Sequence, residues 1–98
     1  MTSSTGTQRR PVVVQKYGGS SVADADLIHN VADRLIAKQD KGVDVVVVVS
    51  AMGDSTDELH ALSKAVTRGA IPDPREMDTL LSTGELVTST LMAMALKA

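Results

Sequence analysis

Residues 43–50 read VDVVVVVS, and this valine run decides the fold. In an extended strand these valines occupy both faces, and a strand that is apolar on both faces lies in the middle of a sheet with helices on each side. Residues 12–17 read VVVQKY and are followed by two glycines, which is typical of a second short strand that ends in a tight turn.

The segment between the two strands has the pattern of one helix. Its apolar residues form a single stripe with the spacing i, i+1, i+4, i+5, i+8 and i+9, made of Leu27, Ile28, Val31, Ala32, Leu35 and Ile36. Asp24 is placed to cap the start of this helix, and Gly42 is placed to end it. Strand, helix and strand form a βαβ unit, so we expect parallel strands joined by a right-handed crossover.

Three more helices are expected after the valine strand. The first covers about residues 57–68, with an inward face made of Leu59, Leu62, Ala65 and Val66. The second covers about residues 74–81, because Asp73 can cap it and Pro74 suits its first position. The third starts at residue 84 or 85 and continues toward residue 97, with an inward face made of Leu86, Val87, Leu91, Met94 and Ala95.

Two strands make an incomplete sheet, because a two-stranded parallel sheet can neither cover its edges nor bury both of its faces. Either other chains complete the sheet, or the sequence is the amino-terminal part of a longer α/β domain. The lack of a stop signal at residues 94–98 favours the second explanation. Residues 1–11 are polar and rich in Ser and Thr, so we expect a disordered tail there, with an organelle-targeting peptide as the alternative, and the domain over residues 12–98.

The composition excludes several classes of function. The 98 residues include no cysteine, one aromatic residue (Tyr17) and two histidines without metal-ligand spacing. Zinc-ribbon and thiol-redox sites need cysteines, and base-stacking platforms need several aromatic residues. With 10 basic against 12 acidic residues, we expect no nucleic-acid partner and no protein-bound metal. The apolar runs, such as Val45–Val49, are all far short of the roughly 18 residues of a membrane helix, so we expect no membrane contact.

One loop follows each strand, and ligands gather at the carboxyl ends of parallel strands. The first loop belongs to the segment KYGGSS, residues 16–21. Its adjacent glycines let the backbone approach an anion closely, and Lys16 can reach the same anion as a point charge. We interpret this segment as a phosphate site; a glycine turn beside a solvated lysine is the structural alternative.

Two further segments carry polar residues suited to a substrate. The loop SAMGDSTD, residues 50–57, gathers hydroxyls and backbone amides at the start of a helix, which suits an anion or a carboxylate. An N-cap at Ser55 or Thr56 is the alternative. In the segment LSTGE, Ser82 and Glu85 have the spacing of a capping box, so a cap is the simpler interpretation of the glutamate.

Four segments, taken in order, resemble the amino-terminal region of the aspartate kinases, which are members of the amino acid kinase family. They are KYGGSSVAD (16–24), VVVVSAMGDSTDEL (46–59), PREMD (74–78) and LSTGE (81–85). The resemblance runs from about Val12 to the end of the sequence, and it is strongest to the bacterial feedback-regulated type.

The resemblance implies an α/β fold, an α/β/α sandwich with a mostly parallel sheet, present here only as its N-terminal portion. It implies a cytoplasmic kinase that transfers the γ-phosphoryl group of ATP, with Mg²⁺ on the nucleotide, to the side-chain carboxylate of L-aspartate. The product would be 4-phospho-L-aspartate, made in the first step of lysine, threonine and methionine biosynthesis. The resemblance also implies a homo-oligomeric parent whose ACT domains bind feedback amino acids; no ACT segment is found in these 98 residues.

The resemblance assigns roles to individual residues. Lys16 is the implied catalytic residue, and the implied nucleotide-binding residues are Lys16, Tyr17, Gly18 and Gly19. The implied contacts of the amino acid substrate are Ser50, Thr56 and Glu85. Because most of the kinase domain is absent, we expect no kinase activity from the 98-residue chain alone. The alternatives are another amino acid kinase, acting on glutamate, acetylglutamate or carbamate, and a non-catalytic binding or assembly module.

Overall fold

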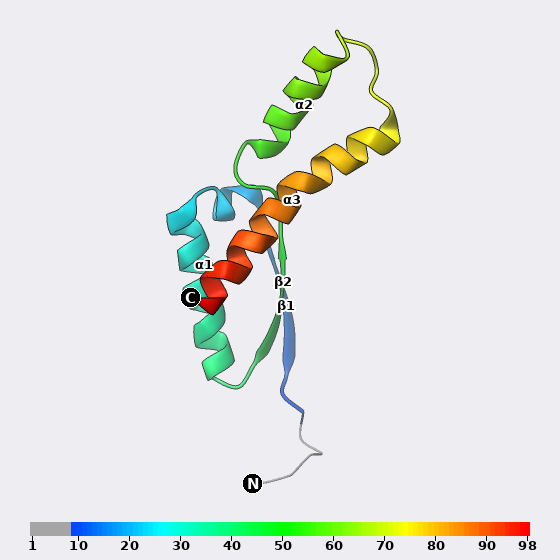
Figure 1. Cartoon of the computed structure of the whole chain (residues 1–98). Helices are drawn as coiled ribbons and strands as arrows, with labels where there is room; N and C mark the ends of the chain where they lie inside the picture. Colours follow the sequence, from blue (N-terminus) through cyan, green and yellow to red (C-terminus); the bar gives the residue numbers. More distant parts are fainter. Residues whose placement is uncertain (1–8) are drawn as a thin grey trace.

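The computed structural model describes residues 9–98, which form a short parallel sheet, one 3₁₀ turn and three helices (Figure 1). In chain order the elements are β1 (Val12–Tyr17), η2 (Gly19–Val22), α1 (Ala25–Asp40), β2 (Asp44–Val49), α2 (Ser55–Val66) and α3 (Pro74–Lys97). The predicted strand–helix–strand order is confirmed by β1, α1 and β2. Residues 1–8 lie outside the described residues, and with them most of the predicted tail and its targeting alternative.

Arg10 and Pro11, which the sequence assigns to the tail, contact the fold at the start of β1. The Arg10 guanidinium forms a salt bridge with Asp44, with 3.0 Å between Nε and Oδ1, and donates a 2.8 Å hydrogen bond to the carbonyl of Gln39. The backbone N–H of Asp44 donates to the Pro11 carbonyl at 2.9 Å. These contacts connect the starts of both strands to the end of α1.

The two strands are parallel, as predicted, and their register runs from Val12 opposite Asp44 to Tyr17 opposite Val49. Alternate residues of both strands face α1 and α3, which cover the same face of the sheet (Figure 1). The other face leaves four valines exposed: Val12, Val14, Val46 and Val48. The sequence predicts helices on both faces, but within residues 9–98 they cover only one.

The core lies between the sheet, α1 and α3. Its six buried residues are Val22, Ile28, Val31, Ala32, Leu35 and Met92. Most of them belong to the apolar stripe predicted for α1. The predicted cap is also confirmed, since the Asp24 carboxylate accepts a 2.9 Å hydrogen bond from the N–H of Leu27. Gly42 follows the helix with a φ of +91°, a left-handed conformation that favours glycine.

Residues 74–97 form one helix, so the prediction of two helices with a boundary near residue 84 is wrong. Asp73 does cap the start, because its carboxylate accepts a 3.1 Å hydrogen bond from the N–H of Glu76. The predicted capping box is absent: the Ser82 hydroxyl donates to the carbonyl of Thr79 at 2.7 Å, inside the helix. The Ser-x-x-Glu pattern marks a helix start only where the preceding residues cannot continue a helix, and here they are good helix formers.

The inward faces predicted for residues 57–68 and for the helix from residue 84 or 85 are mostly wrong, although Leu59 is half-buried against Gly84. α2 buries no side chain, and Leu62 and Val66 are 57% and 75% exposed. In α3 the buried residues are Gly84, Thr88 and Met92. Of the predicted set, Ala95 packs against the core, whereas the exposed members are Leu86, Val87, Leu91 and Met94. Periodicity predicts that the most apolar face of a helix is buried. α3 instead packs against the loop after β2 through the face that carries Gly84, where the missing side chain leaves room.

α2 and the first half of α3 extend away from the sheet as a two-helix arm, residues 55–83 (Figure 1). Among the described residues, α3 is also the one helix that is long and apolar enough to cross a membrane by length and composition. The prediction from uninterrupted apolar runs missed it, because Ser, Thr and Gly interrupt its apolar sequence. Core helices of soluble proteins pass the same test, and Thr88 and Met92 of α3 are buried in the protein itself.

Candidate active site

The loop after β1 begins at Gly18, whose backbone is extended with φ −76° and ψ 172°. The N–H of Ser21 donates a 3.0 Å hydrogen bond to the Gly18 carbonyl, which closes the turn that leads into η2. Apart from residues 17–19 themselves, no heavy atom of the described part of the chain lies within 4 Å of the position that a Cβ on Gly18 would occupy. The backbone is therefore open on this side, and a ligand has room to approach it.

The loop after β2 lies directly against the loop after β1. The N–H of Gly53 donates a 3.0 Å hydrogen bond to the carbonyl of Gly19, and the N–H of Ser50 donates a 3.1 Å hydrogen bond to the carbonyl of Tyr17. A Cβ on Gly19 would lie 3.0 Å from the carbonyl oxygen of Ala51 and 3.2 Å from that of Gly53. Glycine at position 19 is thus required by the contact between the two loops, before any ligand is considered.

The start of α2 carries hydroxyl groups that do not cap the helix. Asp54 is the N-cap residue, no side chain caps the first amides, and Ser55 is already the first helical residue. The N-cap interpretation of Ser55 or Thr56 is therefore wrong. Thr56 is exposed, so its hydroxyl is accessible to a ligand.

Gly84, in the segment LSTGE, lies in the interior of α3 and packs against the loop after β2. A Cβ at this position would lie 3.0 Å from the Cβ of Ala51 and 3.7 Å from Cδ1 of Leu59. Ala51 is only 6% exposed, and it faces Gly19 with its carbonyl oxygen and Gly84 with its methyl group. The three segments singled out from the sequence therefore meet at one buried alanine.

Lys16 and Tyr17 lie on opposite faces of β1. Lys16 is on the exposed face, and the one salt bridge within residues 9–98 lies elsewhere, at Arg10. The Lys16 ammonium group is therefore available to an anion near the end of β1. The Tyr17 ring packs against the core and its hydroxyl donates to Oε1 of Gln15 at 2.7 Å, while its backbone carbonyl accepts the hydrogen bond from Ser50 of the second loop.

The implied substrate contacts differ in their surroundings. Glu85 is exposed on α3, next to the buried Gly84, and without the capping box it has no role in starting a helix. Ser50 is half-buried, and its backbone N–H is engaged with β1. The side chains of Thr56 and Glu85 are thus exposed, one on the helix that follows the second loop and one on the helix that crosses it.

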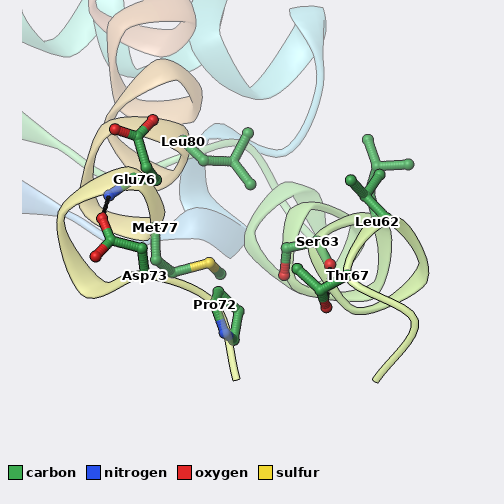
Figure 2. Close-up of a pocket in the computed structure, with 9 residues that line it drawn as sticks. Leu62, Ser63, Thr67, Pro72, Asp73, Glu76, Met77 and Leu80 are labelled. Atoms are coloured by element: carbon green, nitrogen blue, oxygen red, sulfur yellow. Dashed lines mark hydrogen bonds between the residues drawn. The ribbon is translucent and has the colours of Figure 1, made fainter. Parts of the chain in front are cut away.

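Two hollows lie between α2 and α3. One, of about 410 Å³, opens between the far end of α2 and the start of α3 (Figure 2). Its apolar lining residues are Leu62, Val66, Pro72, Met77 and Leu80. It contains none of the predicted site residues. The other, of about 360 Å³, lies at the base of the arm, where Ser55, Thr83 and Gly84 are part of its lining.

The amino acid kinase family matches residues 11–98 of this sequence. This chain belongs to the amino acid kinase family. The match covers all three segments that meet at Ala51, together with the whole of the described sheet.

Members of the family that this chain resembles are aspartokinases. The chain is 55% identical over 87 residues to the aspartokinase of Mycobacterium tuberculosis (strain ATCC 25618 / H37Rv), a match that covers 89% of this chain and 20% of the relative. It is 56% identical over 86 residues to aspartokinase 2 of Bacillus subtilis (strain 168), which covers 88% of this chain and 21% of the relative. The chain therefore spans about a fifth of the length of these curated relatives.

A solved structure supports the same placement within the family. The crystal structure of aspartate kinase from Synechocystis superposes with a TM-score of 0.83 at 46% identity, over 88% of this chain and 14% of that chain. The resemblance to aspartate kinases stated from the four segments is confirmed by these relatives, and so is the α/β fold.

The contact between Ala51 and Gly84 is not predicted from the sequence. The sequence predicts Ala51 only as part of a polar loop, and Gly84 as the boundary of a helix. The signal that was available is the glycine itself, because a buried glycine in the interior of a helix usually marks a close approach of another backbone or side chain.

Proposed function

We propose that this chain forms the phosphate-binding and aspartate-binding part of an aspartate kinase, which transfers the γ-phosphoryl group of ATP to the side-chain carboxylate of L-aspartate. The observation that carries the proposal is the 3.0 Å hydrogen bond from Gly53 to Gly19. It holds the loop beside Lys16 against the loop that leads to Thr56, so that an anion at the first loop and an amino acid at the second are neighbours. The resemblance to aspartokinases over this stretch supplies the substrate class.

The chemistry asks little covalent work of the protein. In the proposed reaction a carboxylate oxygen of aspartate attacks the γ-phosphorus, the bond from that phosphorus to the bridging oxygen breaks, and ADP leaves with the electron pair. The carboxylate is already ionised at pH 7, so no general base is needed. What remains is to bring two anions together and to neutralise the charge of the transferring group.

Lys16 and the backbone of the first loop meet the second requirement. An ammonium group is a compact point charge that can follow the phosphoryl group, and the open side of Gly18 gives a phosphate access to the backbone. Within residues 9–98 no group of three or more His, Cys, Asp and Glu side chains gathers to hold a metal ion. The resemblance to aspartate kinases places the proposed Mg²⁺ on the phosphates of the nucleotide, where it would neutralise charge.

The substrate carries one positive group, its α-ammonium, and Glu85 is an exposed carboxylate beside the meeting point of the loops. We assign Glu85 to that ammonium and the Thr56 hydroxyl to a substrate carboxylate, with Ser50 as a further contact of this loop. The cytoplasmic location, the homo-oligomeric parent with feedback-binding ACT domains and the place in lysine, threonine and methionine biosynthesis belong to the same proposal.

A chimera tests the proposal, because the chain covers only about a fifth of its relatives. In Bacillus subtilis aspartokinase 2, the segment that matches this chain is replaced by the chain's own residues, and ADP release is measured with aspartate, glutamate, acetylglutamate or carbamate as acceptor. We expect aspartate-dependent release with kcat/KM within about tenfold of the unmodified enzyme. A folded chimera that releases no ADP would refute the proposal and favour a non-catalytic module, and a preference for another acceptor would favour another amino acid kinase. The 98-residue chain alone is expected to be inactive.

A further inference from the structure

The contact between Ala51 and Gly84 joins the loop after β2 to α3, the helix that carries Glu85. We propose that these two residues form a positioning contact, which sets where Glu85 stands relative to the loop and thereby governs aspartate binding. The inference rests on the proposed function and deepens it. Neither residue is expected to touch substrate; each acts through its neighbour.

The contact has no spare room. A Cβ on Gly84 would lie 3.0 Å from the Cβ of Ala51, well below the 3.5 to 4.0 Å at which carbon atoms attract each other. Both residues are buried, so neither can turn toward solvent. Any added methyl group must therefore move one of the two backbones.

The loop is the less movable partner. Gly53 is hydrogen-bonded to Gly19 and Ser50 to Tyr17, which holds both ends of the loop against the end of β1. Helix α3 would be the element that moves.

A movement of α3 at this point reaches Glu85 directly. Gly84 and Glu85 are consecutive residues of one helix, and the next turn is fixed by the fully buried Thr88, whose hydroxyl donates to the Gly84 carbonyl at 3.2 Å. With Thr88 held in the core and Gly84 displaced, the helix tilts about Thr88 and carries the Glu85 carboxylate away from the loop. A misplacement of about 1 Å can cost on the order of 10²-fold in rate.

The test is a methyl swap in the active chimera described above. Gly84→Ala adds the clashing methyl group, and the double variant Ala51→Gly with Gly84→Ala moves the methyl from one side of the contact to the other. We expect the single variant to raise the KM for aspartate about tenfold or more while the KM for ATP stays within about twofold. The double variant is expected to return the aspartate KM to within about threefold of the parent chimera.

Ser89→Ala is the matched control, because Ser89 is exposed on the same helix and its substitution likewise adds helix-favouring alanine. It should change neither KM. An aspartate KM that stays unchanged in Gly84→Ala overturns the positioning contact, and so does a folded double variant that keeps the raised KM. If circular dichroism shows that Gly84→Ala alone does not fold, the aspartate KM of the double variant still decides whether the positioning contact exists. An inactive parent chimera would instead refute the proposed function.

Discussion

The backbone N–H of Gly53 donates a 3.0 Å hydrogen bond to the carbonyl of Gly19, and through it the two loops that follow the parallel strands become one unit. The bond uses no side chain. Its existence depends on a close approach that a Cβ on Gly19 would prevent, because the nearest atoms are backbone oxygens that cannot swing aside. The stability of the fold and the geometry of the proposed site are therefore coupled at this residue.

Gly19→Ala is expected to lower the free energy of unfolding of the chain by about 1–3 kcal/mol, the usual cost of forcing an extra carbon into a packed place. The added Cβ would meet the carbonyl oxygens of Ala51 and Gly53 at 3.0 and 3.2 Å. Urea denaturation followed by circular dichroism measures the change. Gly18→Ala is the control, since its Cβ would meet nothing within 4 Å, and it should be neutral or slightly stabilising. Equal losses in both variants would contradict this account.

Lys16→Ala in the chimera is expected to lower kcat by about 10²-fold or more, because a charge aimed at the transferring phosphoryl group acts mainly in the transition state. The loss should appear in kcat and kcat/KM alike. Lys64→Ala, which removes an exposed lysine of the arm, should leave both unchanged. A near-normal kcat in the Lys16 variant would leave that residue as a solvated lysine beside a glycine turn.

The sequence was a good guide where the structure is decided locally. The apolar stripe of α1 and its Asp24 cap depend on neighbouring residues, the parallel pairing follows from the βαβ order, and the structure confirms all three. The continuity of α3 was not predictable in the same way. The Ser82–Glu85 pattern is a start signal in one context and an ordinary helical turn in another, and the choice depends on whether the preceding turn is already helical.

The site shows the same division. The order of the segments, with their glycines and hydroxyls at strand ends, was enough to place them in one family. The point where the segments meet could not be predicted, because it depends on which face of α3 is turned toward Ala51. The most apolar face of that helix was predicted to be inward, yet the buried face is the one that carries Gly84 and Thr88. The close fit of Gly84 to Ala51 lies on the buried face of α3, and the more apolar face stays exposed.

Glu85→Gln in the chimera is expected to raise the KM for aspartate by about 10- to 100-fold, the value of one charge-assisted hydrogen bond to the substrate ammonium. Its melting temperature should stay unchanged, because Glu85 is exposed and caps nothing. Glu76→Gln, an exposed glutamate of the same helix, is the control and should keep the parent KM. A lowered melting temperature with an unchanged aspartate KM would assign Glu85 a structural role instead.

Leu35 and Leu62 were both predicted to face inward, and the structure separates them: Leu35 on α1 is 4% exposed and Leu62 on α2 is 57% exposed. Leu35→Ala should therefore remove about 2–5 kcal/mol from the free energy of unfolding of the chain, through lost burial and the cavity left behind. Leu62→Ala should change it by less than about 0.5 kcal/mol. Urea denaturation of the two variants side by side measures both effects. A large loss on truncating Leu62 would mean that α2 packs against the protein in solution, and the arm would then have to fold back from the position that it has here.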